Sequence, residues 1–302
     1  MKRFLTLVWI VIAAVSCDKN GQPDPAPTPT SAARGIYRTG SFNIRYYNDI
    51  DGEYSWEKRL PAVINFFFDE HPDIIGLQEI RRRQVDDLQS IAGYDSFIMF
   101  RDSGKSSPEN DQDEGNGIMW DKDRFTLADK GFFWLAPDPD TKPTWQNGSY
   151  PWGTTIRRIA VYVKLLDKED NNMPVFFYAT HFDHQKKDAR AAEAEVLLSR
   201  IKSHLFTEDL STLVNRLYVV GDLNSTDNET AYKTLSSSLK SAREASPNTS
   251  QVGTFNDFSN GGSAIDHIFY AGPVKPLSFR VISKNYGIKY ISDHYPIMFE
   301  SD

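Results

Sequence analysis

The chain has 302 residues, of which 40% are hydrophobic and 25% charged, and 41 acidic against 34 basic side chains give a net charge of −7. One large α/β domain or two smaller ones would fill this length. The acidic balance excludes a general electrostatic attraction to nucleic acid, and the single cysteine excludes an intramolecular disulfide.

The first residues are typical of an exported lipoprotein. Lys2 and Arg3 precede an apolar run of about a dozen residues, too short to span a bilayer, and small side chains then lead to Cys17. The segment "AVSC" resembles a bacterial lipobox, in which the cysteine becomes the lipid-modified first residue. We therefore expect a signal peptide at residues 1–16. Its removal leaves 32 basic against 41 acidic side chains, a net charge of −9.

Residues 17–35 contain the lipidated cysteine and a stretch rich in Pro, Thr and Ala without apolar periodicity, which predicts an extended tether. Residues 36–302 form the globular body. The anchor and the tether together predict a monomer held on a bacterial membrane in the cell envelope, either periplasmic or surface-exposed.

Strands and helices alternate through the body. Apolar periodicity predicts strands at 37–44, 73–79, 94–100, 116–121, 131–135, 158–166, 175–181, 216–222, 265–270, 277–283 and 295–300. It predicts helices around 60–68, 83–91, 194–205 and 229–239, with Pro61 in the first turn of the first helix. The strand "VFFYATH" is apolar on both faces and is therefore expected at the centre of a sheet. The mixture predicts one α/β domain with two sheets packed together and helices outside.

The apolar strands end in polar side chains that a protein core would reject. These are Asn43, Glu79, His181, Asp222, Asp266, and the pair Asp293 and His294. In α/β sheets, sites form at the carboxyl ends of strands and in the loops beyond them. Each residue alone has a structural alternative, such as a helix N-terminal acid for Glu79 or a turn for Asp222. Asp266 is harder to dismiss, since an unpaired buried carboxylate costs several kcal/mol, and His294 is its candidate partner.

Six segments in this order resemble the endonuclease/exonuclease/phosphatase superfamily. They are "SFNIR", "GLQE", "THFDH", "GDLN", "IDHI" and "SDHYPI", which together span residues 40 to 298. This superfamily of metal-dependent phosphoesterases includes pancreatic-type DNase, abasic-site endonucleases, neutral sphingomyelinases and inositol-polyphosphate 5-phosphatases. The resemblance implies a four-layer α/β sandwich, with two mixed β-sheets face to face and helices on the outside.

The resemblance also implies a metal site. Glu79 matches the main ligand of a divalent cation, Mg²⁺ or Mn²⁺, because such hard ions prefer carboxylate oxygen. Asn43 and Asp293 would lie beside it as ligands or as partners of ligands. Such an ion activates water and neutralises charge on a phosphate, so no serine or cysteine nucleophile is needed.

Catalytic roles carry over to five further positions. Asp222 and Asn224 would hold the attacking water and the phosphate, and Asp266 would orient the imidazole of His294. His181 would contact a phosphate oxygen or assist the leaving group. Either Asp222 or His294 would be the general base. Because side chains alternate along an extended backbone, we expect the neighbours Asp293 and His294 to point in different directions.

Two longer segments, "SFNIRYYNDIDGEYSWEKR" and "FFWLAPDPD", resemble a bacterial branch of this superfamily, which Arg45, Trp56 and Arg59 match without an assigned role. Either Arg157 or Arg158 would contact the phosphate, since strand alternation directs only one of them toward the site. The nearby aromatic residues either stack on a base or sugar ring or pack the loop onto the domain; they are Trp145, Tyr150 and Trp152.

The sequence thus predicts a metal-dependent phosphoesterase, in the first place a phosphodiesterase or nuclease. The alternatives are a phosphatase or a phospholipid or sphingomyelin phosphodiesterase on the same fold, and a non-catalytic binding lipoprotein. The substrate would be a phosphate ester from a nucleic acid, a nucleotide, an inositol phosphate or a lipid head group.

Overall fold

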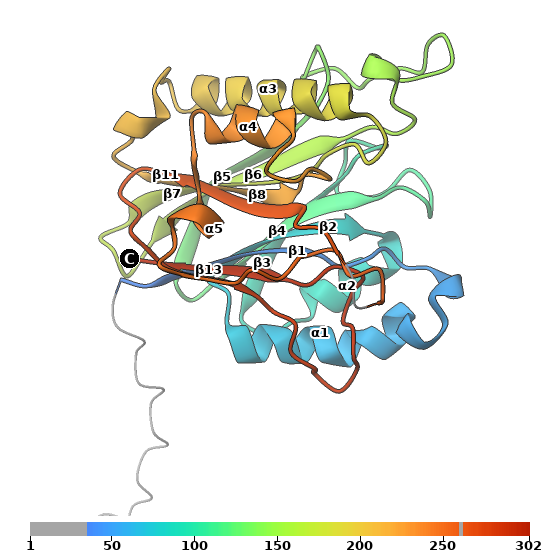
Figure 1. Ribbon diagram of the computed structural model, residues 1–302, viewed down its shortest axis with the longest axis horizontal. Helices are drawn as coiled ribbons and strands as arrows, with labels where there is room; N and C mark the ends of the chain where they lie inside the picture. Colours follow the sequence, from blue (N-terminus) through green and yellow to red (C-terminus); the bar gives the residue numbers. More distant parts are fainter. Residues whose placement is uncertain (1–34, 260–261) are drawn as a thin grey trace, which may run out of the picture. The chain divides into compact units, whose positions relative to one another are not determined.

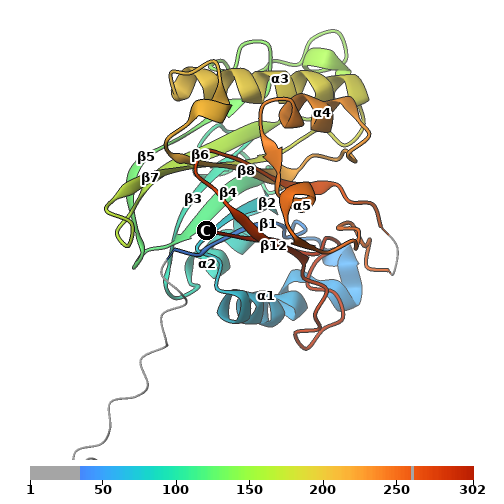
Figure 2. The same ribbon diagram turned by 60° about the vertical axis from the view of Figure 1, so that its left-hand side comes forward.

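Two β-sheets lie face to face, and helices cover the outer face of each sheet (Figures 1 and 2). The computed structural model describes residues 35–259 and 262–302. Helices α3 and α4 lie over one sheet and helices α1 and α2 under the other, so that the order of layers is α/β/β/α. The predicted four-layer sandwich is confirmed.

The first sheet has seven strands and is mixed. Strand β1 pairs in parallel with β2 and antiparallel with β13, and β10 with β12 is the other parallel pair. Across the sheet the order is β10 (Asn248–Thr249), β12 (Pro276–Val281), β13 (Ile297–Ser301), β1 (Tyr37–Asn43), β2 (Ile74–Ile80), β4 (Gly115–Asp121) and β3 (Tyr94–Phe100).

The second sheet has six strands. Its parallel pair is β7 with β8, and its other pairs are antiparallel. Across this sheet the order is β5 (Phe125–Trp134), β6 (Ile159–Asp167), β7 (Met173–His181), β8 (Arg216–Asp222), β11 (Asp266–Ala271) and β9 (Lys240–Ser241).

The α-helices are α1 (Trp56–Glu70), α2 (Arg82–Gln89), α3 (Lys187–His204), α4 (Thr230–Ser236) and α5 (Ala242–Ala245). Three short 3₁₀ turns lie at Asp49–Tyr54, Pro151–Gly153 and Leu210–Thr212.

Three apolar clusters fill the spaces between the four layers. Strand β7 shows how the sequence specifies them, because Phe177 packs between the sheets whereas Phe176 and Tyr178 pack under the helices of the second sheet. The third cluster joins the first sheet to α1, where Phe66 and Phe67 are buried. A strand with two apolar faces is therefore a central strand, as the sequence predicts.

The first helix begins a turn earlier than expected. Pro61 was placed in the first turn, but α1 starts at Trp56, so Pro61 is interior and that prediction is wrong. Proline removes one helical hydrogen bond, and here it lies at an exposed position of the helix. The preceding turn still forms because the backbone N–H groups of Lys58 and Arg59 both bond to the carbonyl of Ser55.

Smaller differences concern strand and helix ends. The strand expected at 131–135 is longer and covers Phe125–Trp134, and β13 begins at Ile297 rather than at 295. Asp293 and His294 therefore lie in the loop before the last strand.

The predicted signal peptide, Cys17 and the tether up to residue 34 lie outside the described residues. Within the described part of the chain, none of the helices combines the length and hydropathy that a membrane span requires.

Candidate active site

Three neighbouring strands of the second sheet place three of the predicted residues side by side. In the parallel pair β7·β8, His181 is aligned with Asp222, and in the antiparallel pair β8·β11, Asp222 is aligned with Asp266. All three side chains are buried. The register of the sheet thus fixes an imidazole and two carboxylates in one row.

The first sheet contributes Asn43 and Glu79 from the ends of its parallel strands β1 and β2. The pairing of β2 with β4 shifts register between Leu77 and Ile80, and Glu79 lies in this irregular stretch with a φ of 62°. The amide of Asn43 donates to Glu79 Oε1 at 2.9 Å and to Asp222 Oδ2 at 3.1 Å. This side chain therefore joins the carboxylates of the two sheets.

The predicted hydrogen bond between His294 and Asp266 is present. His294 Nδ1 lies 2.8 Å from Asp266 Oδ2, although 28 residues separate the two in the chain. Thr254 supports both, because its hydroxyl accepts from the backbone N–H of Asp266 while its carbonyl accepts from that of Tyr295. The loop before β13 is thereby held against the end of β11.

Asp293 has different neighbours from His294, in agreement with the expected divergence of the two side chains. Its carboxylate lies 3.3 Å from Arg45 Nη1 and accepts from the hydroxyl of Ser292 at 3.2 Å. Arg45 is also paired with Asp51 at 3.1 Å. Asp293 is thus held at the wall of the site by an arginine.

The fully buried Arg59 ties together the loops that carry these residues. Its Nη1 donates to the carbonyls of Ile44 at 2.7 Å and Ile291 at 2.9 Å. Its Nε and Nη2 donate to the carbonyls of Tyr54 and Arg45. Burial lowers the pKa of Arg59 to about 10, so the side chain remains charged at neutral pH. It fixes the chain after Asn43 against the chain before Asp293.

The polar residues line one cavity of about 440 Å³. Its walls include Glu79, Asp222, Asn224, His181, Asp293, His294, Arg158, Arg45, Arg101, Glu114 and His184. Asn224 adopts a φ of 48°, and its side-chain amide donates to the carbonyl of Phe182 at 3.0 Å.

The two candidate arginines have different surroundings. Arg157 forms an ion pair with Asp102 at 2.8 Å, donates to the carbonyl of Pro143 and lies 4.3 Å from the centroid of the Tyr150 ring. Arg158 instead lines the cavity and is 4% exposed. Among the described residues no carboxylate lies within ion-pairing distance of Arg158, and its buried Nε has no hydrogen-bond partner.

Arg158 is therefore a buried cation without a matching anion. Its nearest polar side-chain neighbour is the imidazole of His184, with Nη2 at 3.5 Å from Nδ1. Burial lowers the pKa of Arg158 and the neighbouring Arg101 lowers it further, whereas the carboxylates of Glu193, Glu114 and Asp183 raise it from beyond ion-pairing distance. A buried charge is costly unless it is paired, so a bound anion would relieve a real deficit here.

Sequence reasoning missed Arg101 and Glu114, which form an ion pair of 2.7 Å at the mouth of the β3–β4 hairpin. Arg101 directly follows β3 and Glu114 directly precedes β4. The strand-end rule that identified the other polar residues would also have found Arg101, whereas Glu114 stands before a strand and lies outside that rule.

Burial and charge separate the protonation states of the two histidines. Burial lowers the pKa of His181 well below its ordinary value, and Arg158 and Arg101 lower it further. Burial would also lower the pKa of His294, but the carboxylates of Asp266 and Asp222 outweigh it and raise the pKa well above its ordinary value. His181 is therefore neutral and His294 charged at neutral pH without a metal. The 3.5 Å contact between His181 and Asp222 is therefore not an ion pair between two charged groups.

Asp222 lies at the centre of these contacts. Its Oδ2 is 3.5 Å from His181 Nε2, 3.7 Å from His294 Nε2 and 3.1 Å from the amide of Asn43. Burial raises the pKa of Asp222, and the nearby carboxylate of Asp266 raises it further.

Two groups of side chains in the cavity suit a metal ion. Potential ligand atoms of Glu79, His181 and Asp222 all lie within 4.8 Å of one another, and so do those of Asp222, Asp266 and His294. Buried Asp266 Oδ1 also has no hydrogen-bond partner in the protein. Carboxylate-rich sets of this kind suit Mg²⁺ or Mn²⁺.

Two of the three predicted metal ligands lie outside these groups. Asn43 has its Oδ1 occupied by the backbone N–H of Arg45 at 3.1 Å and presents its amide to Glu79 and Asp222. Asp293 faces Arg45 instead. The structure thus brings Glu79 together with His181 and Asp222, and places Asn43 and Asp293 around them.

The aromatic residues of the β5–β6 connection lie partly against one another. The rings of Trp145 and Tyr150 are 5.0 Å apart in a T-shaped arrangement, and Trp145 is 51% exposed. Trp152 has a φ of 61° within a 3₁₀ turn.

The sequence matches the Endonuclease/Exonuclease/phosphatase family over residues 40–294. An endonuclease/exonuclease/phosphatase from Bacteroides vulgatus is 29% identical, with a TM-score of 0.77 over 88% of this chain and 98% of its own. The mannosyl-6-phosphatase of Bacteroides thetaiotaomicron is 26% identical, with a TM-score of 0.77 over 88% of this chain and 99% of its own. The TDP2 of D. rerio, complexed with a single-strand DNA product, is 17% identical, with a TM-score of 0.66 over 89% of this chain and 99% of its own. At this identity the likeness concerns the fold alone.

Two uncharacterized proteins of Acanthamoeba polyphaga mimivirus also match. One is 29% identical over 167 residues, which are 48% of this chain but only 24% of the viral protein. The other is 22% identical over 274 residues, which are 84% of this chain and 94% of the viral protein. The chain thus spans about a quarter of the length of the first relative and nearly all of the second.

The two histidines provide a test of the electrostatics. In the metal-free protein at pH 7, we expect the ring nitrogens of His181 to show a neutral imidazole and those of His294 an imidazolium, because their charged neighbours are opposite in sign. Nitrogen-15 NMR of the imidazole rings distinguishes the two forms. In Asp266→Asn, the pKa of His294 should fall while His181 stays neutral.

The raised pKa of His294 predicts that the free energy of unfolding of the metal-free protein depends on pH. Because the folded-state pKa of His294 is raised, its protonation stabilises the metal-free fold fully below about pH 6.5, the unfolded value, and this contribution is lost as pH rises through the raised pKa. Asp266→Asn should weaken this dependence in thermal unfolding experiments. Two histidines that titrate together near their ordinary pKa would contradict the assignment.

Proposed function

The chain belongs to the Endonuclease/Exonuclease/phosphatase family, and we propose that it is a metal-dependent phosphoesterase whose active site is the cavity at the strand ends of the two sheets. One observation carries this proposal. The buried, unpaired guanidinium of Arg158 shares a cavity with the carboxylates and imidazole of Glu79, Asp222 and His181. A site for an anion beside a site for a cation is what a metal-bound phosphate ester requires.

Glu79, His181 and Asp222 would hold Mg²⁺ or Mn²⁺, with Asn43 positioning the two carboxylates and Asp293 at the adjoining wall. A bound divalent ion supplies a water of lowered pKa and neutralises charge on the phosphate oxygens. The side chain of His181 is available as a ligand because its imidazole is neutral.

The remaining residues would handle protons and charge. Asp222 would orient the attacking water beside the metal, because its Oδ2 lies 3.5 Å from His181 Nε2 and 3.7 Å from His294 Nε2. The imidazolium of His294, oriented by Asp266, would donate a hydrogen bond to a phosphate oxygen. Arg158 would bind another phosphate oxygen. Asn224 shares the wall beside Asp222, where its backbone N–H donates to that carboxylate at 2.8 Å.

For the substrate, we favour a phosphomonoester of a small polar molecule such as a sugar. The cavity of about 440 Å³ has the size of a small-molecule site. The similarity to mannosyl-6-phosphatase extends over 88% of the chain at 26% identity. Inositol phosphates and nucleotides belong to the same chemical class.

A phosphodiesterase or nuclease is the second candidate. It is favoured by the fold shared with TDP2, which was solved with a single-strand DNA product, although at 17% identity this likeness concerns the fold alone. The net charge of −7 disfavours tight binding of a nucleic-acid duplex. Phospholipid diesters, including sphingomyelin, and a non-catalytic binding role are the remaining alternatives.

We further propose that the protein belongs to a lipoprotein branch of the family and is anchored through Cys17. The supporting features are the basic start, the apolar run and the small residues before this cysteine. An anchored enzyme in the cell envelope would meet phosphate esters outside the cytoplasm.

The proposed chemistry predicts dependence on a metal and on two side chains. A panel of activated monoester, activated diester, sugar phosphates, inositol phosphates, DNA, RNA and sphingomyelin should show turnover that chelation abolishes and Mg²⁺ or Mn²⁺ restores. His294→Ala should lower kcat by about 10²- to 10³-fold, the typical loss when one preorganised donor to a reacting anion is removed. Glu79→Ala should abolish the response to added metal. A folded wild-type protein without metal-stimulated turnover on any substrate would refute the enzyme proposal.

Arg158 and Arg157 form a matched pair of variants. Arg158→Gln should lower kcat/KM by about 10²-fold, comparable to the loss of one preorganised donor to a reacting anion. Arg157→Gln should leave kcat/KM little changed, because its guanidinium is bound to Asp102 and the Pro143 carbonyl outside the cavity. Thermal unfolding of both variants controls for folding. Equal losses in the two variants would show that Arg158 has no special role.

Anchoring can be tested with Cys17→Ser. Cells expressing the wild-type chain and fed a labelled fatty acid should yield labelled protein in the membrane fraction, whereas the variant should be unlabelled. Labelled variant protein, or an unlabelled wild-type chain, would contradict lipidation at this cysteine.

A further inference from the structure

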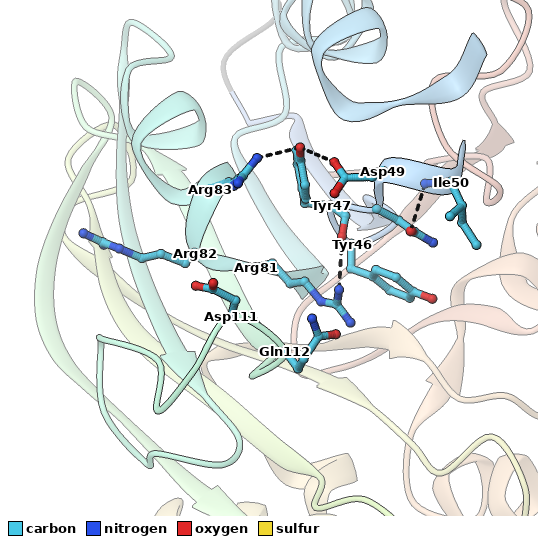
Figure 3. A pocket seen from close by; sticks show the side chains of 10 residues that line it. Tyr46, Tyr47, Asp49, Ile50, Arg81, Arg82, Arg83, Asp111 and Gln112 are labelled. Carbon is cyan, nitrogen blue, oxygen red and sulfur yellow. Dashed lines mark hydrogen bonds between the residues drawn. The ribbon is translucent and has the colours of Figure 1, made fainter. Parts of the chain in front are cut away.

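A second cavity of about 390 Å³ adjoins the catalytic one, because Tyr46 lines both. Figure 3 shows the side chains that line it. Three consecutive arginines, Arg81, Arg82 and Arg83, line it together with the rings of Tyr46 and Tyr47. None of the predicted catalytic or metal-binding residues lines this cavity, so it needs its own explanation.

The two cavities share a wall. Tyr46 lines both of them, and its backbone N–H donates to Glu79 Oε2 at 3.2 Å. The guanidinium groups of Arg45, from the catalytic cavity, and Arg81, from the second cavity, lie 4.3 and 4.0 Å from the centroid of the Tyr46 ring. The walls of the second cavity follow Asn43 and Glu79 directly in the chain, so the same strand ends position both.

Two of the three arginines are held in place by Tyr47. Arg83 Nη1 donates to the hydroxyl of Tyr47 at 2.6 Å, and that hydroxyl donates to Asp49 at 2.6 Å (Figure 3). Arg81 Nη1 donates to the carbonyl of Tyr47 at 3.1 Å. The tyrosine is itself fixed through its backbone N–H, which donates to the buried side chain of Gln84 at 2.9 Å.

The cavity retains unused donors. Arg82 is exposed and makes no hydrogen bond or ion pair with any residue in the described part of the chain. Two carboxylates also line the cavity, Asp49 and Asp111, and Asp49 already accepts from Tyr47. Arg81 also pairs with Glu114 at 3.4 Å, so Arg82 and Arg83 are the two guanidinium groups of this cavity that have no carboxylate within ion-pairing distance in the described part of the chain.

We propose that this second cavity binds a second phosphate group on the substrate whose first phosphate occupies the catalytic cavity. The proposal deepens the proposed function and rests on it. Guanidinium groups match the oxygens of a phosphate with paired N–H donors. The shared Tyr46 wall means that one molecule with two phosphates can reach both cavities. The enzyme would thus prefer substrates with two phosphates over the matching monophosphates.

The test uses substrates that differ only in the second phosphate and its spacing. Bisphosphates of linear alkanediols of several lengths are compared with the monophosphates of the same chains, and phosphate release is measured with metal present. For at least one length, the wild-type KM should be about tenfold lower for the bisphosphate than for its monophosphate, which corresponds to about 1.4 kcal/mol. In the double variant Arg82→Gln with Arg83→Gln, this advantage should disappear while the kinetics of the monophosphates stay unchanged.

A matched control removes the same charge elsewhere. Arg200→Gln with Lys187→Gln changes two basic residues on α3, outside the second cavity, and should preserve the bisphosphate preference. The proposal is overturned if no bisphosphate is preferred at any length, or if the control loses the preference as much as the double variant.

A binding measurement separates this proposal from the proposed function. Calorimetry with inorganic tripolyphosphate and a chelator requires no turnover, and the double variant should bind about tenfold more weakly than the wild type. Equal affinities would overturn the second phosphate site even in an active enzyme. Loss of affinity in a protein that hydrolyses no substrate would keep the site and refute the phosphoesterase.

Discussion

Like charges gathered away from water are the constraint on which this site depends. Glu79, Asp222 and Asp266 converge from both sheets, and Asp222 and Asp266 are almost completely buried. Two unit charges 4 Å apart repel by about 4 kcal/mol at the effective dielectric constant of a protein surface, and by more in the interior. The fold can bring them together only with positive charge nearby. His294 supplies one charge, and a bound divalent cation would supply the rest.

The same constraint gives the cavity two electrically different sides. On the carboxylate side, Asp266 and Asp222 keep His294 protonated. On the arginine side, burial together with Arg158 and Arg101 lowers the pKa of His181 and keeps it neutral. Two histidines that line the same cavity thus have opposite charge states, which suit the charged donor and the neutral ligand that we propose.

Much of this arrangement could be predicted from the sequence because strand ends are easily recognised. An apolar run that stops at a polar residue marks both the strand and the site, as at His181 and Asp222. The pairing of Asp266 with His294 could be inferred because a buried carboxylate requires a partner. The sequence could not show which of Arg157 and Arg158 lines the cavity. The alternation of side chains along a strand indicates only that the two point in different directions. Pro61 misled the prediction, because one lost hydrogen bond on an exposed helix face is tolerated where the rest of the helix is packed.

Arg59 limits which residues of this protein can be substituted. All four of its hydrogen bonds end on main-chain carbonyls, those of Ile44, Arg45, Tyr54 and Ile291. Side chains at those four positions can therefore be exchanged without removing an acceptor, whereas no other residue type offers a fork of donors that reaches all of them. The main chain of these loops can therefore keep its place when side chains such as those of Ile44 and Ile291 change, provided that Arg59 is retained and Arg45 still holds Asp293.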